Sequence, residues 1–284
     1  MGNWRKQVRI FAVFLFAATL SLTMQVTVVV GERQPAQISL IGLTNDNTLV
    51  RFPSNNPRET ARVKVSGLTG TLVGIDLRPA NGLLYGVSDA NNIYTIDPTT
   101  GAATLICTLT ISFDGARSSG IDFNPQSDRL RLLARNGQNL RVHADLGATA
   151  VDGSLAYATT DHNAGTTPTI TAVAYTNSIP QAPITKTFDI DSNLDVLVLQ
   201  EPPNDGILLT VGPLGIDFGP MVGFDILTDG SGKDHAFAVS GATLYAIDLG
   251  TGAATTLGTI GDGSLNFVGL TAVAVPSSSF QLNK

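Results

Sequence analysis

Three aspartates stand at the same place in three related segments of the chain. Asp76, Asp122 and Asp225 each close a Gly-x-Asp string, which reads Gly-Ile-Asp, Gly-Ile-Asp and Gly-Phe-Asp. Carboxylates that a fold brings together bind a cation or raise one another's pKa, because neighbouring like charges resist ionising together. The alternative is that each aspartate accepts hydrogen bonds from nearby backbone. We take the three as candidate metal ligands, able to support metal-assisted attack by water.

A second acidic run, Asp-Ile-Asp-Ser-Asn-Leu-Asp, supplies another candidate metal site. Its alternating oxygen-bearing residues Asp189, Asp191 and Asn193 resemble the opening of a calcium-binding loop. Two positions depart from that loop, since Leu194 replaces the turn glycine and Gln200 replaces the bidentate glutamate. The alternative is that Asp191 starts a turn, as the aspartate at the same place does in the related segments.

Basic residues gather in one short stretch, which contains Arg117, Arg129, Arg131, Arg135 and Arg141. Strand alternation places Arg129 and Arg131 on one face, and the Asn136-Gly137 turn returns Arg141 beside them. Guanidinium groups arranged in this way hold a carboxylate or a sulfate. We take Arg129, Arg131 and Arg141 as candidate ligand-binding residues. The alternative is that they form ion pairs with the aspartates of the same stretch, namely Asp122, Asp128 and Asp145.

The elements that must position these residues repeat about every fifty residues. Val73–Gly101 is echoed by Val222–Gly252, and a period of this size is typical of propellers and other repeat folds. Short runs of Val, Ile, Leu and Thr alternate with turn residues, and no run keeps a helical period, so the fold is all-β. In one complete repeat we expect strands at Leu72–Leu77, Leu83–Ser88, Asn92–Ile96 and Ala103–Leu109.

The ends of the repeat region indicate how the fold closes. First strands of the repeat begin near Gly74, Gly120, Thr171, Gly223 and Thr271. Three strands without a first strand precede them, at Ile38–Leu43, Thr48–Phe52 and Ala61–Val65, and Phe267–Val275 is a first strand without the other three. Pairing the two ends leaves few free edges. We therefore predict a β-propeller of five four-stranded blades, in preference to six or seven blades or a β-solenoid.

In a propeller the first strands line the central channel, so Asp76, Asp122 and Asp225 are expected to converge on its axis. Val173 and Val273 are expected at the equivalent positions of the other two blades. The metal-site prediction therefore depends on the ring being closed as described.

Composition narrows the classes of partner. The chain is 43% hydrophobic and 14% charged, and its net charge is −6. An acidic protein of this kind repels phosphate backbones, which argues against nucleic acid as a partner. Cys107 is the only cysteine, so no internal disulfide forms.

The first thirty residues have the pattern of an export signal. Arg5, Lys6 and Arg9 precede the apolar stretch Ile10–Val30. That stretch is long enough to cross a bilayer, so an uncleaved anchor remains an alternative and would be the protein's one link to a membrane. We expect residues 1–31 to be a signal peptide or anchor, 32–276 a single propeller domain and 277–284 a flexible tail. The protein is then exported, to the periplasm, the cell surface or the medium.

Parts of the repeat region resemble a known family. Ile121–Val142, Ala172–Asn177 and Phe188–Gly215 contain the strings Asn-Pro-x-x-Asp-Arg-Leu-Arg, Gly-Gln-Asn-Leu-Arg and Pro-Pro-Asn-Asp-Gly in that order. Together they resemble the domain-of-unknown-function 4394 family of exported bacterial proteins, over roughly residues 37–276. Arg135-Asn136 and His143-Ala144 depart from the family pattern in turns. The resemblance implies an exported, propeller-like repeat domain and transfers no catalytic residue.

These observations favour a binding or interaction module over an enzyme. No P-loop, dinucleotide fingerprint or nucleophile elbow is present, and the three histidines have no ligand partner at metal spacing, which argues against a zinc site. We expect a monomer that binds a small molecule, a glycan or a protein, with no required cofactor and calcium as the one candidate ion. The alternatives are a metal-assisted hydrolase or lyase using Asp76, Asp122 and Asp225, and a structural surface or matrix protein.

Overall fold

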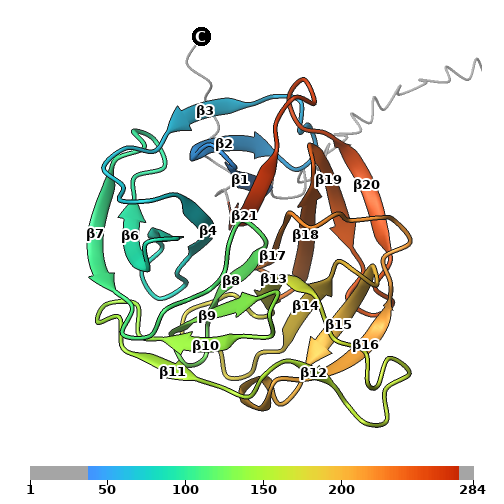
Figure 1. The fold of residues 1–284 in the computed structure, drawn as a ribbon. Coiled ribbons are helices and arrows are strands. Elements are labelled where there is room, and N and C mark those ends of the chain that lie inside the picture. The colour runs from blue at the N-terminus through green and yellow to red at the C-terminus, as the bar shows by residue number, and fades with distance from the viewer. Residues whose placement is uncertain (1–37, 275–284) are drawn as a thin grey trace, which may run out of the picture. The chain divides into compact units, whose positions relative to one another are not determined.

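Five small sheets stand around a common axis in the structure, a computed structural model that describes residues 38–274 (Figure 1). Each sheet contains four antiparallel strands, to which one sheet adds a short fifth, parallel strand, and no α-helix occurs among the described residues. The predicted five-bladed β-propeller is therefore confirmed. The predicted signal or anchor segment, the predicted tail and both predicted domain boundaries lie outside residues 38–274 and stay predictions. Within that range no helix is long and apolar enough to cross a membrane.

The blades are numbered here in chain order from the one that contains the first described strand. Blade 1 consists of β21 (Phe267–Ala274), β1 (Ile38–Thr44), β2 (Thr48–Pro53) and β3 (Ala61–Lys64), from the axis outward. Blade 2 consists of β4 (Leu72–Leu77), β5 (Leu84–Ser88), β6 (Asn92–Ile96) and β7 (Ala103–Thr108). Blade 3 consists of β8 (Ser119–Asn124), β9 (Arg129–Ala134), β10 (Asn139–Val142) and β11 (Thr149–Val151).

Blade 4 carries an additional strand. It consists of β13 (Ile170–Tyr175), β14 (Thr187–Asp191), β15 (Val196–Gln200) and β16 (Ile207–Pro213), and the short β12 (Ala156–Tyr157) pairs parallel to β16. A 3-10 turn, Pro203–Asp205, connects β15 to β16. Blade 5 consists of β17 (Val222–Thr228), β18 (Asp234–Ser240), β19 (Thr243–Ile247) and β20 (Ala254–Thr259).

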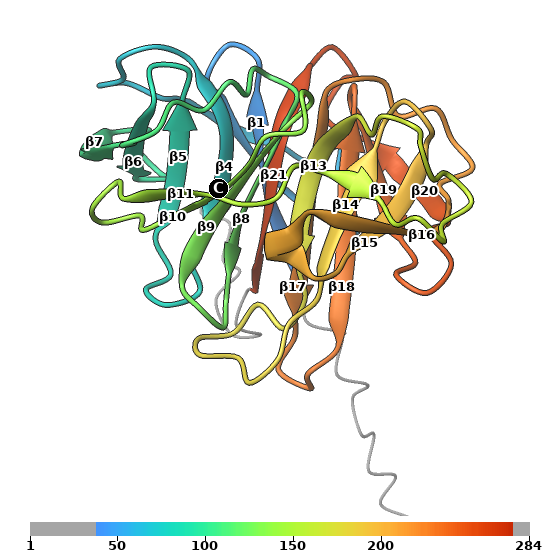
Figure 2. The ribbon, with the colours of Figure 1, turned by 60° about the horizontal axis from the view of Figure 1, so that its bottom comes forward.

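Strands from the two ends of the described chain complete blade 1. β1 runs antiparallel to β21, with a register from Ile38 opposite Ala274 to Thr44 opposite Phe267. This is the closure that the incomplete terminal repeats predicted. Because β21 is the innermost strand of that blade, it packs against the axis while β1 holds it by hydrogen bonds (Figures 1 and 2).

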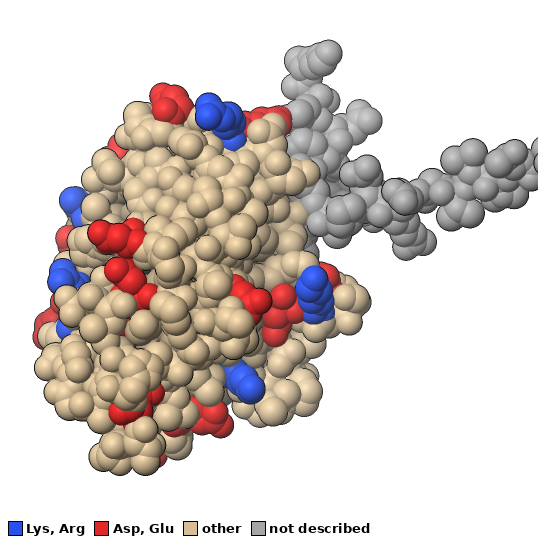
Figure 3. All heavy atoms as spheres, turned by 90° about the vertical axis from the view of Figure 1, so that its right-hand side faces the viewer, with Lys and Arg blue, Asp and Glu red and all other residues tan. Residues whose placement is uncertain are grey.

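Apolar side chains fill the spaces between neighbouring blades, which gives the ring its core. Tyr85 of blade 2 and Phe123 of blade 3 meet edge to face with ring centroids 5.1 Å apart. Such contacts bury apolar area on both blades and add aromatic attraction. On the side shown in Figure 3 the surface is mostly uncharged, with acidic and basic side chains scattered over it.

Glycines form a constriction halfway along the channel. Gly74, Gly120, Gly223 and Gly269 lie on four inner strands, and the space between the strands at this level is about 10 Å³. A Cβ at Gly223 would lie 2.6 Å from the carbonyl carbon of Gly269. A Cβ at Gly120 would lie 2.8 Å from the amide nitrogen of Val173. We call this level the glycine constriction; it sets how closely the next residues along the inner strands approach one another.

Candidate functional site: carboxylates at the axis

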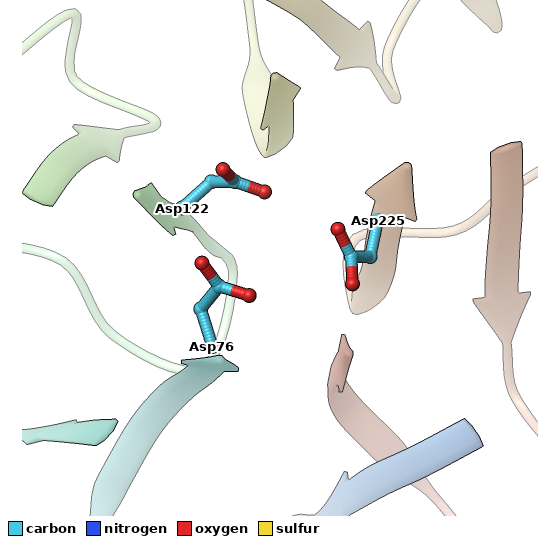
Figure 4. Close-up of side chains that lie close together, drawn as sticks. All are labelled: Asp76, Asp122 and Asp225. Carbon is cyan, nitrogen blue, oxygen red and sulfur yellow. The ribbon is translucent and has the colours of Figure 1, made fainter. Parts of the chain in front are cut away.

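Three inner strands each bring one aspartate to the axis, two residues beyond the glycine constriction. Asp76 comes from β4, Asp122 from β8 and Asp225 from β17, and their carboxyl groups point toward one another (Figure 4). One oxygen of each lies within 4.8 Å of the others, and the three residues are 4–6% exposed. The convergence predicted from the Gly-x-Asp strings is confirmed. We call this group the carboxylate cluster.

Asp76 is held by donors from its own strand and from both neighbouring blades. Its carboxylate accepts hydrogen bonds from the Leu77 amide (2.7 Å), the Phe123 amide (2.8 Å) and the Thr271 hydroxyl (3.0 Å). These donors stabilise the ionised form. Burial and the nearby Asp225 outweigh them, so the pKa of Asp76 lies well above its usual range.

Asp225 is held in a similar way. The amides of Ile226 and Ala272 each donate to it at 2.6 Å. Burial raises the pKa of Asp225 to about 6, and these amides together with the Thr271 and Asp122 side chains limit the rise.

Asp122 has the weakest support from donors. Burial and the negative charges of Asp76 and Asp225 raise its pKa well above the usual range, and the Tyr175 amide opposes the rise. Without a cation, Asp122 therefore favours its protonated form.

The hydrogen bonds show which residues stand in the equivalent positions of the remaining two blades. Asp76 accepts from Phe123, the residue after Asp122, and Asp225 accepts from Ala272, the residue after Thr271. Thr271 therefore takes the aspartate position in β21. In the same way Asp122 accepts from the Tyr175 amide, so Ala174, the residue before Tyr175, takes that position in β13. The assignment of Val273 and Val173 to these positions was wrong, because hydrophobic pattern alone does not determine the register between blades.

A pocket of about 190 Å³ opens next to the carboxylate cluster. Apolar residues such as Leu77, Ile226 and Leu227 line it together with the aspartates and Arg78. Arg78 does not neutralise the aspartates, since its guanidinium is paired with Asp128 at 2.5 Å and Asp145 at 2.6 Å. These two carboxylates raise the pKa of Arg78 further.

The carboxylate cluster can hold either protons or a hard cation. Several of its oxygens retain a lone pair beyond the hydrogen bonds described, and carboxylate oxygens are the ligands that calcium and magnesium prefer. Among residues 38–274, this is the one group of three His, Cys, Asp or Glu side chains close enough to share a metal ion. The geometry therefore fits a metal, and metal binding itself stays a prediction.

The acidic run of β14 does not form a matching group. Asp191 accepts hydrogen bonds from the Tyr157 hydroxyl and from the Thr169, Asn193 and Leu194 amides. It acts as the turn-starting aspartate that the alternative interpretation described. Asn193 is exposed, and calcium binding by this run stays a prediction that the geometry does not favour.

Asp189 faces blade 3 instead, where both carboxylate oxygens are buried without a hydrogen-bond partner among the described residues. Burial raises its pKa and the positive charge of Arg131 opposes the rise. Asp189 thus belongs to the packing between blades 3 and 4.

The three candidate arginines have different surroundings. Arg131 is buried, and its guanidinium donates to Asp152 (2.6 Å), Asn139 (2.6 Å), Asn204 (2.9 Å) and the Tyr175 hydroxyl (3.0 Å). These bonds connect blade 3 to blade 4 and to the 3-10 turn. Arg131 is therefore committed to the fold, and its carboxylate partner is Asp152 rather than Asp122, Asp128 or Asp145.

Arg141 and Arg129 lie nearer the surface. Arg141 donates to the same Asp152 oxygen at 2.7 Å, and Arg129 donates to the backbone carbonyl oxygens of Ser127 and Asp128. Arg131 and Arg141 are thus brought together at Asp152, whereas Arg129 caps its own turn. A ligand role for the three stays a prediction. Arg131 and Arg141 are ion-paired, but with Asp152 and not with the three aspartates that the alternative named.

The sequence alone did not identify two residues that lie near the carboxylate cluster. Thr271 donates to Asp76 from the opposite end of the chain, and Arg78 lines the pocket with its charge already paired. Arg78 follows the first Gly-x-Asp string by two residues, so aligning the repeats by these strings could have placed it close to the aspartates. Thr271 belongs to no Gly-x-Asp string, so the sequence did not indicate its role.

The fold and the cluster together define the chain as a five-bladed β-propeller with an acidic pocket on its axis. The family model described as "Domain of unknown function (DUF4394)" matches residues 48–271, and the chain belongs to that family. The resemblance inferred from the sequence is thereby confirmed. No curated protein matches the chain.

Two solved structures are similar at low identity. One is a structural genomics protein of unknown function from Bacteroides thetaiotaomicron, with 14% identity, a TM-score of 0.49, and 77% of this chain aligned to 55% of that one. The other is YCF48 bound to a D1 peptide, with 14% identity, a TM-score of 0.36, and 74% of this chain aligned to 60% of that one. The chain thus spans less than two thirds of either structure.

Proposed function

We propose that this protein is an exported binding module that binds a divalent cation, calcium being the expected ion, at Asp76, Asp122 and Asp225. One observation carries the proposal: one oxygen from each carboxylate lies within 4.8 Å of the others, and all three side chains are buried. Three buried carboxylates without a positively charged partner lower the stability of the fold, and a bound cation removes that penalty.

The arrangement suits a hard ion that keeps part of its solvent shell. Calcium takes about 6–8 oxygen ligands, and the three aspartates supply only some of them. The adjoining pocket of about 190 Å³ gives waters or the oxygens of a small molecule access to the remaining positions. Donors from Leu77, Phe123 and Ala272 fix the carboxylates of Asp76 and Asp225 beforehand, which limits the ordering that accompanies binding.

The residues around the pocket support binding better than hydrolysis by a serine nucleophile. Its lining contains no His, Lys or Cys among the described residues, and Ser178 is its one serine. The Ser178 hydroxyl accepts from the Thr228 amide at 2.9 Å and contacts the Thr228 hydroxyl at 3.4 Å, with no base beside it. An activated serine needs an adjacent base.

Thermal unfolding of the full chain in excess calcium and in excess chelator tests the proposal. At one hundred times the Kd, a ligand that binds only the folded state adds about 2.7 kcal/mol, which corresponds to roughly 5–10 °C in Tm. The variant Asp122→Asn should lose this rise, because a neutral amide replaces one ligand.

Asp189→Asn is the matched control, since Asp189 is also a fully buried aspartate with a raised pKa but lies outside the carboxylate cluster. It should keep the calcium response. An unchanged Tm of the native chain in calcium would refute the proposal, as would a full response in Asp122→Asn.

Export is proposed on the basic and apolar N-terminal pattern. N-terminal sequencing of protein recovered from the periplasm and medium of an expressing bacterium tests it: export predicts recovery there, and confinement to the cytoplasm would contradict it.

A further inference from the structure

A second pocket lies at the other end of the axial channel. It has a volume of about 460 Å³ and is formed where β4, β8 and β17 begin, whereas the carboxylate cluster lies where they end. Val73, Pro220 and Met221 give it an apolar wall, and Arg117 and Arg135 give it two positive charges. We call it the arginine pocket.

The two arginines have no structural partner. Of the nine arginines in residues 38–274, six form hydrogen bonds or ion pairs with other groups: Arg51, Arg62, Arg78, Arg129, Arg131 and Arg141. Arg58, Arg117 and Arg135 form none within the described part of the chain. Two of these three meet at one pocket, so ten N–H donors are available there to a ligand.

The segments that carry the two arginines are fixed to each other. Arg117 lies in the loop before β8, and Arg135 begins the turn between β9 and β10. Gln138 of that turn accepts from the Asp114 amide at 2.8 Å and donates to the Ser112 carbonyl oxygen at 2.9 Å. The loop and the turn therefore keep their spacing when the pocket is empty, which lowers the cost of binding.

We propose that the arginine pocket binds a small organic acid with a single carboxylate. The carboxylate pairs with Arg117 and Arg135, since the planar guanidinium fork matches a carboxylate in shape and charge. The hydrocarbon part of the acid lies on Val73, Pro220 and Met221. Asp89 also lines the pocket, and its charge leaves a net charge of one positive unit, which suits a monoanion better than a dianion.

The arginine pocket is separate from the metal site. The glycine constriction, with about 10 Å³ of free space, separates the arginine pocket from the carboxylate cluster. Calcium binding and acid binding can therefore succeed or fail separately, and each has its own variants.

Titration of the full chain with hexanoate, followed by NMR of the arginine side-chain Nε–Hε signals, tests the proposal. We expect the signals of Arg117 and Arg135 to move with a Kd on the order of 1–10 mM, as for other ligands of this size. Arg117→Gln and Arg135→Gln should each weaken binding about tenfold, the loss of one charge-assisted hydrogen bond.

Arg58→Gln is the matched control, because Arg58 is exposed and unpaired but lies outside the pocket. It should leave the Kd unchanged. Hexanamide, which lacks the charge, and inorganic sulfate, which lacks the hydrocarbon part, should both bind more weakly than hexanoate. The proposal is overturned if hexanoate moves neither signal, if Arg58→Gln weakens binding as much as the pocket variants do, or if sulfate binds as tightly as hexanoate.

Discussion

The two ends of the axial channel are built from the same five inner strands and differ in charge and burial. At the end where the strands finish, three aspartates are buried with their carboxyl groups close together. At the end where they begin, two arginines are exposed and unpaired. The aspartates occupy equivalent strand positions and depend on the register of the ring, whereas the arginines occupy loops and turns. Strand positions thus create a desolvated cluster, and loops add charge at little cost to folding.

The largest expected effect comes from removing a strand that serves the cluster and the constriction together. Deletion of residues 267–284 removes Thr271 and Gly269 and exposes the inner edge of β1. We expect no cooperative unfolding transition, because the ring cannot close and the edge is open. Calorimetry of the truncated chain measures this.

Deletion of residues 277–284 alone is the control for that experiment and should leave Tm unchanged. A cooperative transition at the original Tm in the longer deletion would show that blade 1 does not need β21.

A smaller loss is expected from crowding the glycine constriction between the two ends. Gly223→Ala places a methyl group 2.6 Å from the Gly269 backbone, and backbone cannot move aside as a side chain does. We expect the free energy of unfolding to fall by about 3 kcal/mol, at the upper end of the usual cost of overpacking. Urea unfolding measures it.

Gly230→Ala is the comparison, because a Cβ at Gly230 meets nothing within 4 Å. It should change the free energy by less than about 0.5 kcal/mol. Equal losses in both variants would mean that close approach at the axis is not what requires glycine.

The acidic end should make stability depend on pH in an unusual direction. Asp76, Asp122 and Asp225 have pKa values raised by burial, so the folded state keeps protons that the unfolded state releases. Their contribution is complete below the unfolded pKa near 4 and is lost as pH rises through about 6, the folded pKa of Asp225, and beyond. In chelator, Tm should fall over this window, and calcium should restore more of it at higher pH.

Surface aspartates with lowered pKa values, such as Asp229, change the stability of the fold only at pH values below this window, because their contribution is lost only under acidic conditions. The difference between the native chain and Asp122→Asn isolates the carboxylate cluster, and the variant should show the shallower fall. A Tm that rises with pH in chelator across the window would contradict the raised pKa values.

The smallest expected effect concerns the arginine end. Arg117→Gln and Arg135→Gln should each change the free energy of unfolding by less than about 0.5 kcal/mol, since neither arginine has a partner to lose. Arg131→Gln is the contrasting variant and should cost about 3 kcal/mol, because Asp152 would keep a buried, poorly paired charge. Urea unfolding of the three variants measures both expectations. A large loss in Arg117→Gln would place that residue in the fold.

Most of the fold was predictable, because turn residues and apolar runs recur at a fixed spacing. The strands expected in blade 2 match β4 to β7 to within one residue, and the incomplete terminal repeats identified the closure. These features are local or periodic, which is the kind of information that a single sequence carries.

The site was predictable only in part. Equivalent Gly-x-Asp strings identified Asp76, Asp122 and Asp225, since equivalent strand positions meet at an axis. Thr271 was missed because its role depends on a hydrogen bond to a strand almost two hundred residues away. The partner of Arg131 was missed for the same kind of reason, since Asp152 reaches it from the far edge of the blade.

The closure of blade 1 also has a consequence for synthesis. β21 is the last described strand to leave the ribosome, yet β1, the first, has no inner partner until it arrives. Between the synthesis of β1 and that of β21 the nascent chain therefore lacks the inner partner of β1, and open edges of this kind attract other chains. Resistance to proteases that depends on the closed ring would follow only after β21 is made.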